Sequence, residues 1–403
     1  MQNVFNTLER RGYVEQLTHP EEIKKLFEKE CVPFYIGIDP TADSLHVGHF
    51  ISLMVASHMQ KAGHKPIILM GGGTAIIGDP SGKTDMRKML TVEDIDNNVA
   101  QIKKQIEKFL SFEGPNAAII VNNGDWLRDL NYINFMREIG VHFSVNRMLA
   151  AECYKNRLET GLTFFELGYM LMQSYDFLYL HDHYGCKLEM GGNDQWSNII
   201  GGVELIRKIG AEDAYGFTFK LLTTKEGKKM GKTEKGALWL NPEKTSPYEF
   251  YQYWRNVADD DIENVMKLLT FIDVDEIEEM TKYKDERINE AKRRAAFEIT
   301  KLVHGEEAAI KAEEATKAMF EGKGNVEAME STKVEAGCTI TEALVNAGIA
   351  PSKGQAKTLI SQGAISLNDE KIDDIAYVLK EEDFKEGYAI LRKGKKIYHK
   401  LTK

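Results

Sequence analysis

The chain has few cysteines and no long apolar run, and each absence excludes a class of protein. Its four cysteines, Cys31, Cys153, Cys186 and Cys338, lie far apart in 403 residues and include no C-x-x-C pair. This spacing argues against a zinc site and against a disulfide framework. No apolar stretch approaches the roughly 18 residues of a membrane span, and the N-terminal segment has no signal-peptide core. We therefore expect a cytoplasmic protein with no membrane partner and no metal site.

Two common glycine-rich nucleotide motifs are also absent. The segment MGGGTAIIGDPSGKTDMR (residues 70–87) is rich in glycine, but a P-loop ending in its G-K-T would need glycine at position 77, which is Ile77. No G-x-G-x-x-G fits this segment either. What remains is a loop that carries Lys83 and Arg87, with Asp79 at its start. Taken alone, its glycines fit a tight surface turn about as well as an anion site.

Charge is distributed unevenly along the chain. The net charge is -10, which on average disfavours nucleic acid as a partner, but residues 338–403 carry 11 basic and 9 acidic side chains. The remaining residues carry 41 basic and 53 acidic side chains. The last stretch, RKGKKIYHKLTK, holds six basic residues, a tyrosine and no acidic residue. Such a patch can follow a phosphate backbone, although a solvated basic terminus explains the charge equally well.

Hydrophobic patterning predicts an α/β fold in the first part of the chain. Short apolar runs that end in turn residues indicate strands at 33–39, 65–73, 116–123, 185–192 and 215–224. Between the first two runs, apolar residues recur at helical spacing, with Thr41, Asp43 or Ser44 as the expected N-cap and Gly63 as the stop. This succession predicts a Rossmann-like parallel sheet, which binds ligands at the carboxyl ends of its strands.

The remainder of the chain predicts two further domains. From Pro247 to about residue 323 the pattern is that of long helices rich in Glu, Lys and Ala. The polar segment that follows is typical of a linker, and the last segment predicts two short helices and then a β-hairpin around Asn368 and Asp369. The expected organisation is a catalytic domain at 1–246, a helical domain at 247–323, a linker at 324–337 and a small α+β domain at 338–403.

Two loops carry candidate functional residues. DPTADSLHVGHF (residues 39–50) places His46 and His49 around Gly48 at a predicted helix start, a spacing that lets both rings meet one ligand. GKKMGKTEKG (residues 227–236) places lysines among glycines, where they can approach a polyphosphate as point charges. For the lysines taken alone, a solvated loop is the more frequent explanation.

A polar line on one apolar helix is the strongest single signal. In FFELGYMLMQSYDFLYL (residues 164–180), Tyr169, Gln173 and Asp176 share one side of a helix made otherwise of Phe, Leu and Met. The line is either the solvent face or the wall of a pocket, because an unpaired buried carboxylate is costly. In GGNDQW, two glycines followed by Asp194 and Gln195 suit a ribose, because the backbone can approach closely and a carboxylate binds hydroxyls. A helix N-cap at Asn193 or Asp194 is the structural alternative, and the two roles are compatible.

In this order the segments resemble the bacterial tyrosyl-tRNA synthetases of class I. YIGIDPTADSLHVGH resembles the family's HIGH-type signature and KMGKT its KMSKS-type loop. GDPSGK, GGNDQW and TSPYEFYQYW (residues 245–254) are similar to further family segments. Residues 338–403 resemble an S4-type RNA-binding domain, which argues against the related tryptophanyl enzymes. The resemblance covers the chain from end to end.

The resemblance implies the reaction and its partners. Tyrosine and ATP, the latter with Mg²⁺, would form tyrosyl-adenylate and pyrophosphate, and the tyrosyl group would pass to the terminal ribose of tRNA(Tyr). The resemblance implies a homodimer. It implies no tightly bound cofactor and no zinc. The helical domain would recognise the anticodon. The apolar run at 130–149 is a candidate dimer surface, although it could equally be core.

The resemblance also assigns roles residue by residue. Tyr35 and Asp176 would hydrogen-bond the substrate phenol, while Asp79, Tyr169 and Gln173 would accept from its ammonium. Gln195 would lie near the carboxylate of tyrosine or the α-phosphate. A larger set would hold ATP and its phosphates: Gly37, Asp39, Thr41, His46, Gly48, His49, Gly192, Asp194, Lys83, Arg87, Lys229, Lys232 and Thr233. Glycine at 48 would leave room for the adenine ring.

Three positions depart from common family patterns. Ile36 stands where cysteine is frequent, Glu189 stands where glutamine is usual, and KMGKT has Gly231 and Thr233 where many class I enzymes have serines. Two rival functions are a non-catalytic RNA-binding protein on the same scaffold and a small-molecule adenylyltransferase. The intact histidines and lysines argue against the first, and the two C-terminal domains argue against the second.

Overall fold

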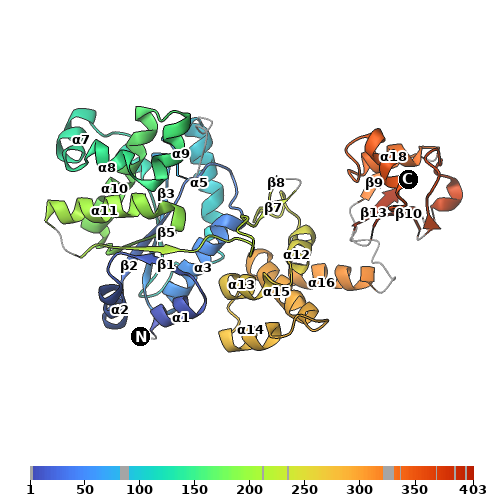
Figure 1. Ribbon diagram of the computed structural model, residues 1–403, viewed down its shortest axis with the longest axis horizontal. Coiled ribbons are helices and arrows are strands. Elements are labelled where there is room, and N and C mark those ends of the chain that lie inside the picture. Colours follow the sequence, from blue (N-terminus) through green and yellow to red (C-terminus); the bar gives the residue numbers. More distant parts are fainter. Residues whose placement is uncertain are drawn as a thin grey trace. The chain divides into compact units, whose positions relative to one another are not determined.

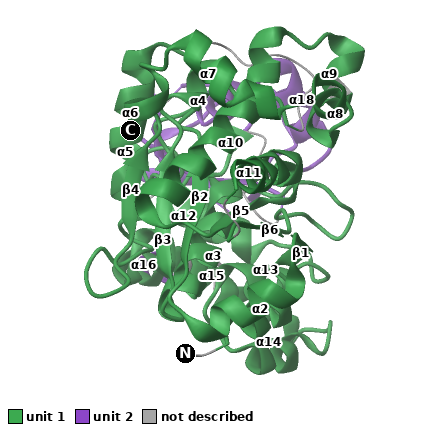
Figure 2. Ribbon diagram, turned by 90° about the vertical axis from the view of Figure 1, so that its left-hand side faces the viewer, with its two compact units in different colours: residues 1–310 green, residues 311–403 purple. Residues whose placement is uncertain are grey.

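The computed structural model describes residues 3–81, 90–210, 213–233, 236–320, 331–335, 337–368, 370–384, 387–394 and 397–403. The predicted site residues Lys83 and Arg87 lie outside these ranges, as do the side chains of Lys232 and Thr233. The chain forms two compact units, residues 1–310 and residues 311–403 (Figure 2).

A six-stranded sheet organises the first unit. Its strands, in spatial order, are β1 (Val14–Leu17), β6 (Tyr215–Phe219), β5 (Leu188–Gly192), β2 (Pro33–Ile38), β3 (Lys65–Met70) and β4 (Ile119–Asn122). Neighbours from β6 to β4 pair in parallel, while β1 pairs antiparallel with β6 at the edge. The five predicted strands are confirmed with shorter bounds. Strand β1 is not predicted because its four residues, VEQL, carry little apolar signal.

Helices cover both faces of this sheet, which explains why its central strands are continuous apolar runs. Figure 1 shows α10 (Phe164–Tyr184) and α11 (Trp196–Ile209) on one side and α3 (Val47–Lys61) on the other. The other helices before residue 246 are α1 (Val4–Arg10), α2 (Pro20–Lys29), α4 (Thr74–Ile77), α5 (Val92–Ile106), α6 (Gly124–Leu127), α7 (Tyr132–Glu138), η1 (Gly140–His142), α8 (Val145–Leu149), α9 (Glu152–Thr160) and η2 (Asn193–Gln195).

The stretch that follows Pro247 is helical, as its pattern predicts. Its helices are α12 (Pro247–Arg255), α13 (Ile262–Leu269), α14 (Val274–Thr281), α15 (Ile288–His304) and α16 (Glu306–Phe320). Ser246 and Glu249 form a capping box at the start of α12, with proline at the first helical position. Between the sheet and α12, the short strands β7 (Lys232–Thr233) and β8 (Gly236–Ala237) pair antiparallel. Across the described ranges, no helix has both the length and the apolar character that crossing a membrane requires.

The second unit is a small α+β fold. Its sheet has the strand order β11 (Glu370–Lys371), β10 (Ile365–Leu367), β12 (Tyr388–Lys393), β13 (Ile397–Thr402) and β9 (Ser331–Lys333). The helices are α17 (Ile340–Asn346), α18 (Lys353–Ser361) and η3 (Glu381–Asp383). Ile340, Leu344, Ile365 and Leu391 form part of its buried core.

The second unit contains the predicted hairpin and has a strand in place of part of the predicted linker. The predicted hairpin is present as β10 and β11, with Asn368 at a positive φ of 48°, while Asp369 lies outside the described residues. Part of the predicted linker is wrong, because residues 331–333 form β9 and pair in parallel with β13. The sequence of β9, STK, is polar and at the sheet edge, so no apolar pattern marks it as a strand.

Candidate active site

The site lies where the order of the parallel strands reverses. Strands β2 and β5 are neighbours, and the chain continues from β2 to β3 on one side and from β5 to β6 on the other. Ligands of open α/β sheets bind at such a point, beyond the carboxyl ends of the strands. A cavity of about 640 Å³ opens there. All fifteen predicted site residues that the structure describes in full line it: Tyr35, Gly37, Asp39, Thr41, His46, Gly48, His49, Asp79, Tyr169, Gln173, Asp176, Gly192, Asp194, Gln195 and Lys229.

The amino end of α3 is built from the two predicted histidines. His46 is the N-cap, and its Nδ1 accepts a hydrogen bond from the Gly48 amide at 3.0 Å. His49 Nδ1 accepts from the His46 amide at 3.3 Å, and the two rings stack with centroids 4.0 Å apart. Because Nδ1 of each ring is the acceptor, Nε2 carries the proton of the neutral ring. The pair therefore supplies N–H donors at the positive end of a helix, which suits an anion.

One expectation about this helix start is wrong. The N-cap is His46 rather than Thr41, Asp43 or Ser44, because the backbone around His46 pairs with residues 238–240 and keeps the chain extended up to that point. A Cβ at Gly48 would lie 2.7 Å from His46 Cε1. The His46 ring is thus one reason for glycine at this position, and the expected room for an adenine ring stays a prediction.

The buried end of the cavity contains an acid and a phenol. Asp176 is 1% exposed, and its two oxygens accept from Asn123 Nδ2 and from Trp126 Nε1, each at 2.8 Å. Burial raises the pKa of Asp176 well above its usual range, and the two donors oppose this rise. The Tyr35 hydroxyl is buried beside it and makes no hydrogen bond among the described residues. This end of the cavity can form hydrogen bonds with the hydroxyl group of a ligand.

The polar line on α10 faces the cavity and is not a solvent face. The Tyr169 hydroxyl donates to Asp39 Oδ2 at 2.9 Å, and Asp39 Oδ1 accepts from Thr74 Oγ1 at 2.8 Å. Gln173 Nε2 donates to Glu189 Oε1 at 2.9 Å. The helix therefore delivers a hydroxyl, an amide and a carboxylate to one cavity wall.

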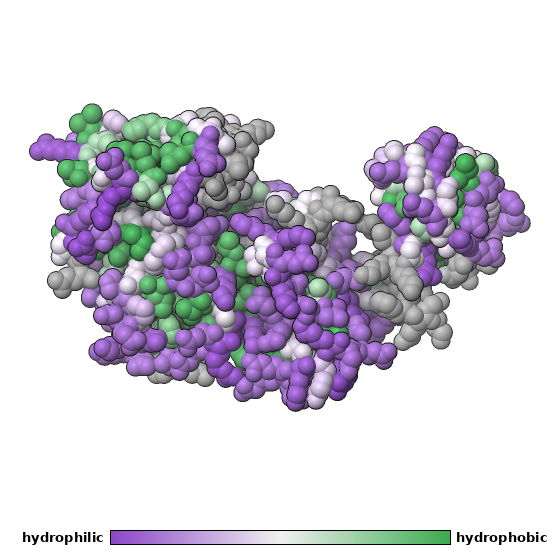
Figure 3. Space-filling model, in the orientation of Figure 1, coloured by the Kyte–Doolittle hydropathy of each residue, from purple (hydrophilic) through white to green (hydrophobic). Residues whose placement is uncertain are grey.

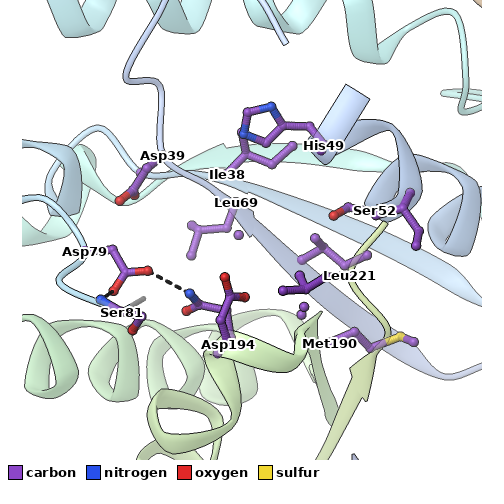
Figure 4. Close-up of a pocket in the computed structure, with 18 of the residues that line it drawn as sticks. Ile38, Asp39, His49, Ser52, Leu69, Asp79, Ser81, Met190, Asp194 and Leu221 are labelled. Atoms are coloured by element: carbon purple, nitrogen blue, oxygen red, sulfur yellow. Dashed lines mark hydrogen bonds between the residues drawn. The ribbon is translucent and has the colours of Figure 1, made fainter. Parts of the chain in front are cut away.

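Two further carboxylates project into the space between the two ends. Asp79 accepts from Gln195 Nε2 at 2.7 Å and from the Ser81 amide at 2.9 Å. Figure 4 shows Asp39 and Asp79 at the cavity wall, and Asp194 on the opposite side of the cavity from His49. Burial raises the pKa of Asp194, and Lys229 opposes this rise. The N-cap alternative for residues 193 and 194 is wrong, because neither side chain caps the 3₁₀ turn η2 or helix α11.

The lysine loop lies at the open end of the cavity. Lys229 Nζ is 3.7 Å from Asp194 Oδ2, and its side chain is 57% exposed. Lys228 instead pairs with Glu226 and is 77% exposed, as expected for a solvated loop. The Gly231 amide donates to the Tyr253 hydroxyl of α12 at 2.7 Å, so the helical part of the unit holds the backbone beside Lys232.

The sequence reasoning missed three residues that organise the site. Asn123 directly follows β4, so the rule that found Asp39 at the end of β2 would also have found it. Trp126 and Thr74 carry no comparable signal, because only the fold brings them to Asp176 and Asp39. Within the described ranges, no group of three His, Cys, Asp or Glu side chains is arranged to hold a metal ion.

Comparisons with known proteins agree with this arrangement. Residues 28–321 match the family of class I tRNA synthetases (W and Y), and residues 321–401 match the tyrosine-tRNA ligase SYY-like C-terminal domain. The chain is 60% identical to the tyrosine-tRNA ligase of Clostridium perfringens (strain 13 / Type A) over all of both chains. It is 58% identical to that of Acetivibrio thermocellus, over all of this chain and 99% of the relative. The chain belongs to the tyrosine-tRNA ligases.

Solved structures of such ligases share its architecture. A C-terminally truncated mitochondrial tyrosyl-tRNA synthetase from Aspergillus nidulans is 28% identical, with a TM-score of 0.72 over 79% of this chain and 95% of its own. The tyrosyl-tRNA synthetase of Archaeoglobus fulgidus, solved with L-tyrosine, is 18% identical, with a TM-score of 0.59 over 77% of this chain and 99% of its own. At this low identity the likeness shows only that the two chains share a fold. The predicted family, fold class and enzyme class are confirmed.

Proposed function

We propose that this tyrosine-tRNA ligase activates tyrosine with ATP in the described cavity and then transfers the tyrosyl group to tRNA(Tyr). One observation carries the proposal: a single cavity joins a buried acid and phenol at one end to two stacked histidines on a helix N-terminus at the other. The first end suits a phenolic amino acid, and the second suits a triphosphate.

At the buried end, Tyr35 and Asp176 bind the tyrosine hydroxyl. Asp176 is held by Asn123 and Trp126, so it is fixed before the substrate enters. Phenylalanine would leave the Tyr35 hydroxyl without a hydrogen-bond partner, which costs about 1–3 kcal/mol for a buried neutral group, and would leave Asp176 with only Asn123 and Trp126 as donors. Asp79, Tyr169 and Gln173 accept from the ammonium.

At the open end, the chain stabilises charge and supplies no nucleophile of its own. The tyrosine carboxylate attacks the α-phosphorus of ATP, and pyrophosphate leaves with its magnesium ion. His46, His49 and Thr41 meet the phosphates on one side, while Gly192, Asp194 and Gln195 meet the ribose and the α-phosphate. Lys83, Arg87, Lys229, Lys232 and Thr233 close on the departing pyrophosphate. Donors that bind more strongly in the transition state than in bound ATP raise the rate.

The parts that follow residue 246 serve the tRNA. We assign anticodon recognition to the helical region 247–323 and general RNA binding to residues 338–403. In the second unit, Arg392 lies over the Tyr398 ring at 5.3 Å and Lys400 over the Tyr388 ring at 4.9 Å, so cations alternate with aromatic rings on one sheet. Such a surface suits a phosphate backbone with unstacked bases. Arg392→Ala with Lys400→Ala should weaken tRNA binding and leave tyrosine activation unchanged.

An apolar surface around α7 fits a second copy of the chain. Ile133, Val141, Val145 and Phe164 are 56–70% exposed, and Figure 3 shows apolar side chains gathered over α7. Contiguous exposed apolar surface of this kind marks an interface. We therefore propose a homodimer. Ile133→Asp should shift sedimentation to the monomer, whereas Val92→Asp, a control at a residue 46% exposed on α5, should not.

The deciding experiment is tyrosine-dependent exchange of labelled pyrophosphate into ATP. We expect exchange with tyrosine and almost none with phenylalanine or tryptophan. Absence of exchange, or equal exchange with the other amino acids, would refute the proposed activation. A tRNA charging assay then tests the second step, and binding of tRNA without any exchange would favour a non-catalytic RNA-binding role.

A further inference from the structure

Glu189 is a second buried carboxylate in the cavity, and none of the substrate contacts assigned above uses it. It lies on β5 and is 1% exposed. Its Oε1 accepts from Gln173 Nε2 at 2.9 Å, while Oε2 is buried and makes no hydrogen bond among the described residues. A Cβ on Gly202 of α11 would lie 3.0 Å from Oε2, so the helix closes over this carboxylate. A buried carboxylate held in this way needs a cation or a proton.

The hydrogen bond to Glu189 fixes which way the Gln173 amide points. An ionised carboxylate can only accept, so once Glu189 has lost its proton the Gln173 amino group must face it, and the carbonyl oxygen Oε1 must face the other way. Gln173 lines the cavity, and this Oε1 is buried without a hydrogen bond among the described residues. A glutamine at 189 would donate or accept and would leave the Gln173 amide less firmly oriented.

We propose that Glu189 is a positioning residue for the substrate ammonium: it turns Gln173 Oε1 into the ammonium site, and it loses a proton when tyrosine binds. The inference rests on the proposed function, because it requires a ligand with a phenol and an ammonium group. It adds to that function an account of how the negative charge of Glu189 is balanced at the buried end of the cavity. The proton leaves Glu189 for solvent, and the bound ammonium replaces it as the balancing positive charge.

The surroundings of Glu189 support this proton balance. Burial raises the pKa of Glu189 to about 7, although the Tyr35 and Gln173 side chains offset part of the rise. Tyr35 faces it from β2, Gln173 and Asp176 from α10, Gly202 from α11, and Cys186 from the segment before β5. None of these described neighbours is a cation, and Asp176 adds negative charge. A substrate ammonium is therefore the group that favours the ionised form.

The test compares the full-length wild type with Glu189→Gln, which keeps the size of the side chain and loses its charge. Tyrosine binding is measured by calorimetry between pH 6 and pH 8, in buffers of different ionisation enthalpy. If Glu189 must be ionised, the wild-type Kd should rise about tenfold from pH 8 to pH 6, with proton release near pH 7. Glu189→Gln should vary less than about twofold and release no proton.

A second ligand tests whether the phenol and the ammonium of tyrosine are sufficient for the proton release. Tyramine keeps the phenol and the ammonium but lacks the carboxylate, so it should release the same proton from the wild type. If Glu189→Gln showed the same pH dependence and the same proton release as the wild type, the inference would be overturned. The proton would then come from another group, and Asp176 would be the next residue to test. Absence of tyrosine binding to the wild type at every pH would instead overturn the proposed function. A merely structural role would alter the melting temperature without changing the pH profile.

Discussion

The Tyr253 hydroxyl offers a sharp test of how the lysine loop is held. It accepts from the Gly231 amide at 2.7 Å, and a Cβ on Gly231 would lie 3.0 Å from Val47 Cβ. The loop backbone is thus fixed between α12 and the first turn of α3, one residue before Lys232. Tyr253→Phe removes only the oxygen atom and leaves the aromatic ring in place.

The expected effect follows from one lost hydrogen bond. A neutral hydrogen bond of this kind contributes about 1 kcal/mol net, which corresponds to about a fivefold change in the ratio of seated to unseated loop. We expect the rate constant for pyrophosphate exchange to fall, by up to about fivefold. The tyrosine Kd should stay unchanged, because the loop lies at the open end of the cavity and the tyrosine end is built from β2, α10 and β5.

A matched control is Tyr283→Phe, which removes a hydroxyl from an exposed tyrosine that does not line the cavity. Exchange is measured at saturating tyrosine over a range of ATP concentrations, and the tyrosine Kd by equilibrium dialysis. An unchanged exchange rate in Tyr253→Phe, or an equal fall in the control, would refute the reasoning. So would a weakened tyrosine Kd with a normal rate.

Three further variants probe the two ends of the cavity. Trp126→Phe removes a donor to the Asp176 carboxylate and should raise the tyrosine KM about tenfold or more, with a smaller change in kcat, measured by exchange at varied tyrosine. Gly48→Ala forces the His46 ring aside and should lower exchange about a hundredfold, while circular dichroism shows an intact fold. Lys232→Ala should slow adenylate formation by a similar factor in stopped-flow fluorescence and leave the tyrosine Kd unchanged. Loss of tyrosine affinity at a normal rate would refute the assigned role of the lysine.

Local patterns predicted most of the first sheet and most of the site. The apolar runs at β2 and β3 are strands because both faces of a parallel sheet are buried, so their sequence needs no polar alternation. The polar line on α10 could be recognised because a carboxylate on an apolar helix needs a partner. Strands β1 and β9 escaped prediction, because short polar edge strands gain their stability from neighbours distant in sequence.

The sequence by itself indicated many of the side chains that reach the cavity. Its strand ends, helix start and helical spacing place Tyr35, Asp39, His46 and Asp176 along one sheet edge, because these periodicities follow from backbone geometry. The tertiary structure alone decided how these groups are held. Segment 238–240 makes His46 the N-cap, and Trp126 and Asn123 orient Asp176. Burial among β2, α10 and α11 raises the pKa of Glu189, and no local pattern records that burial.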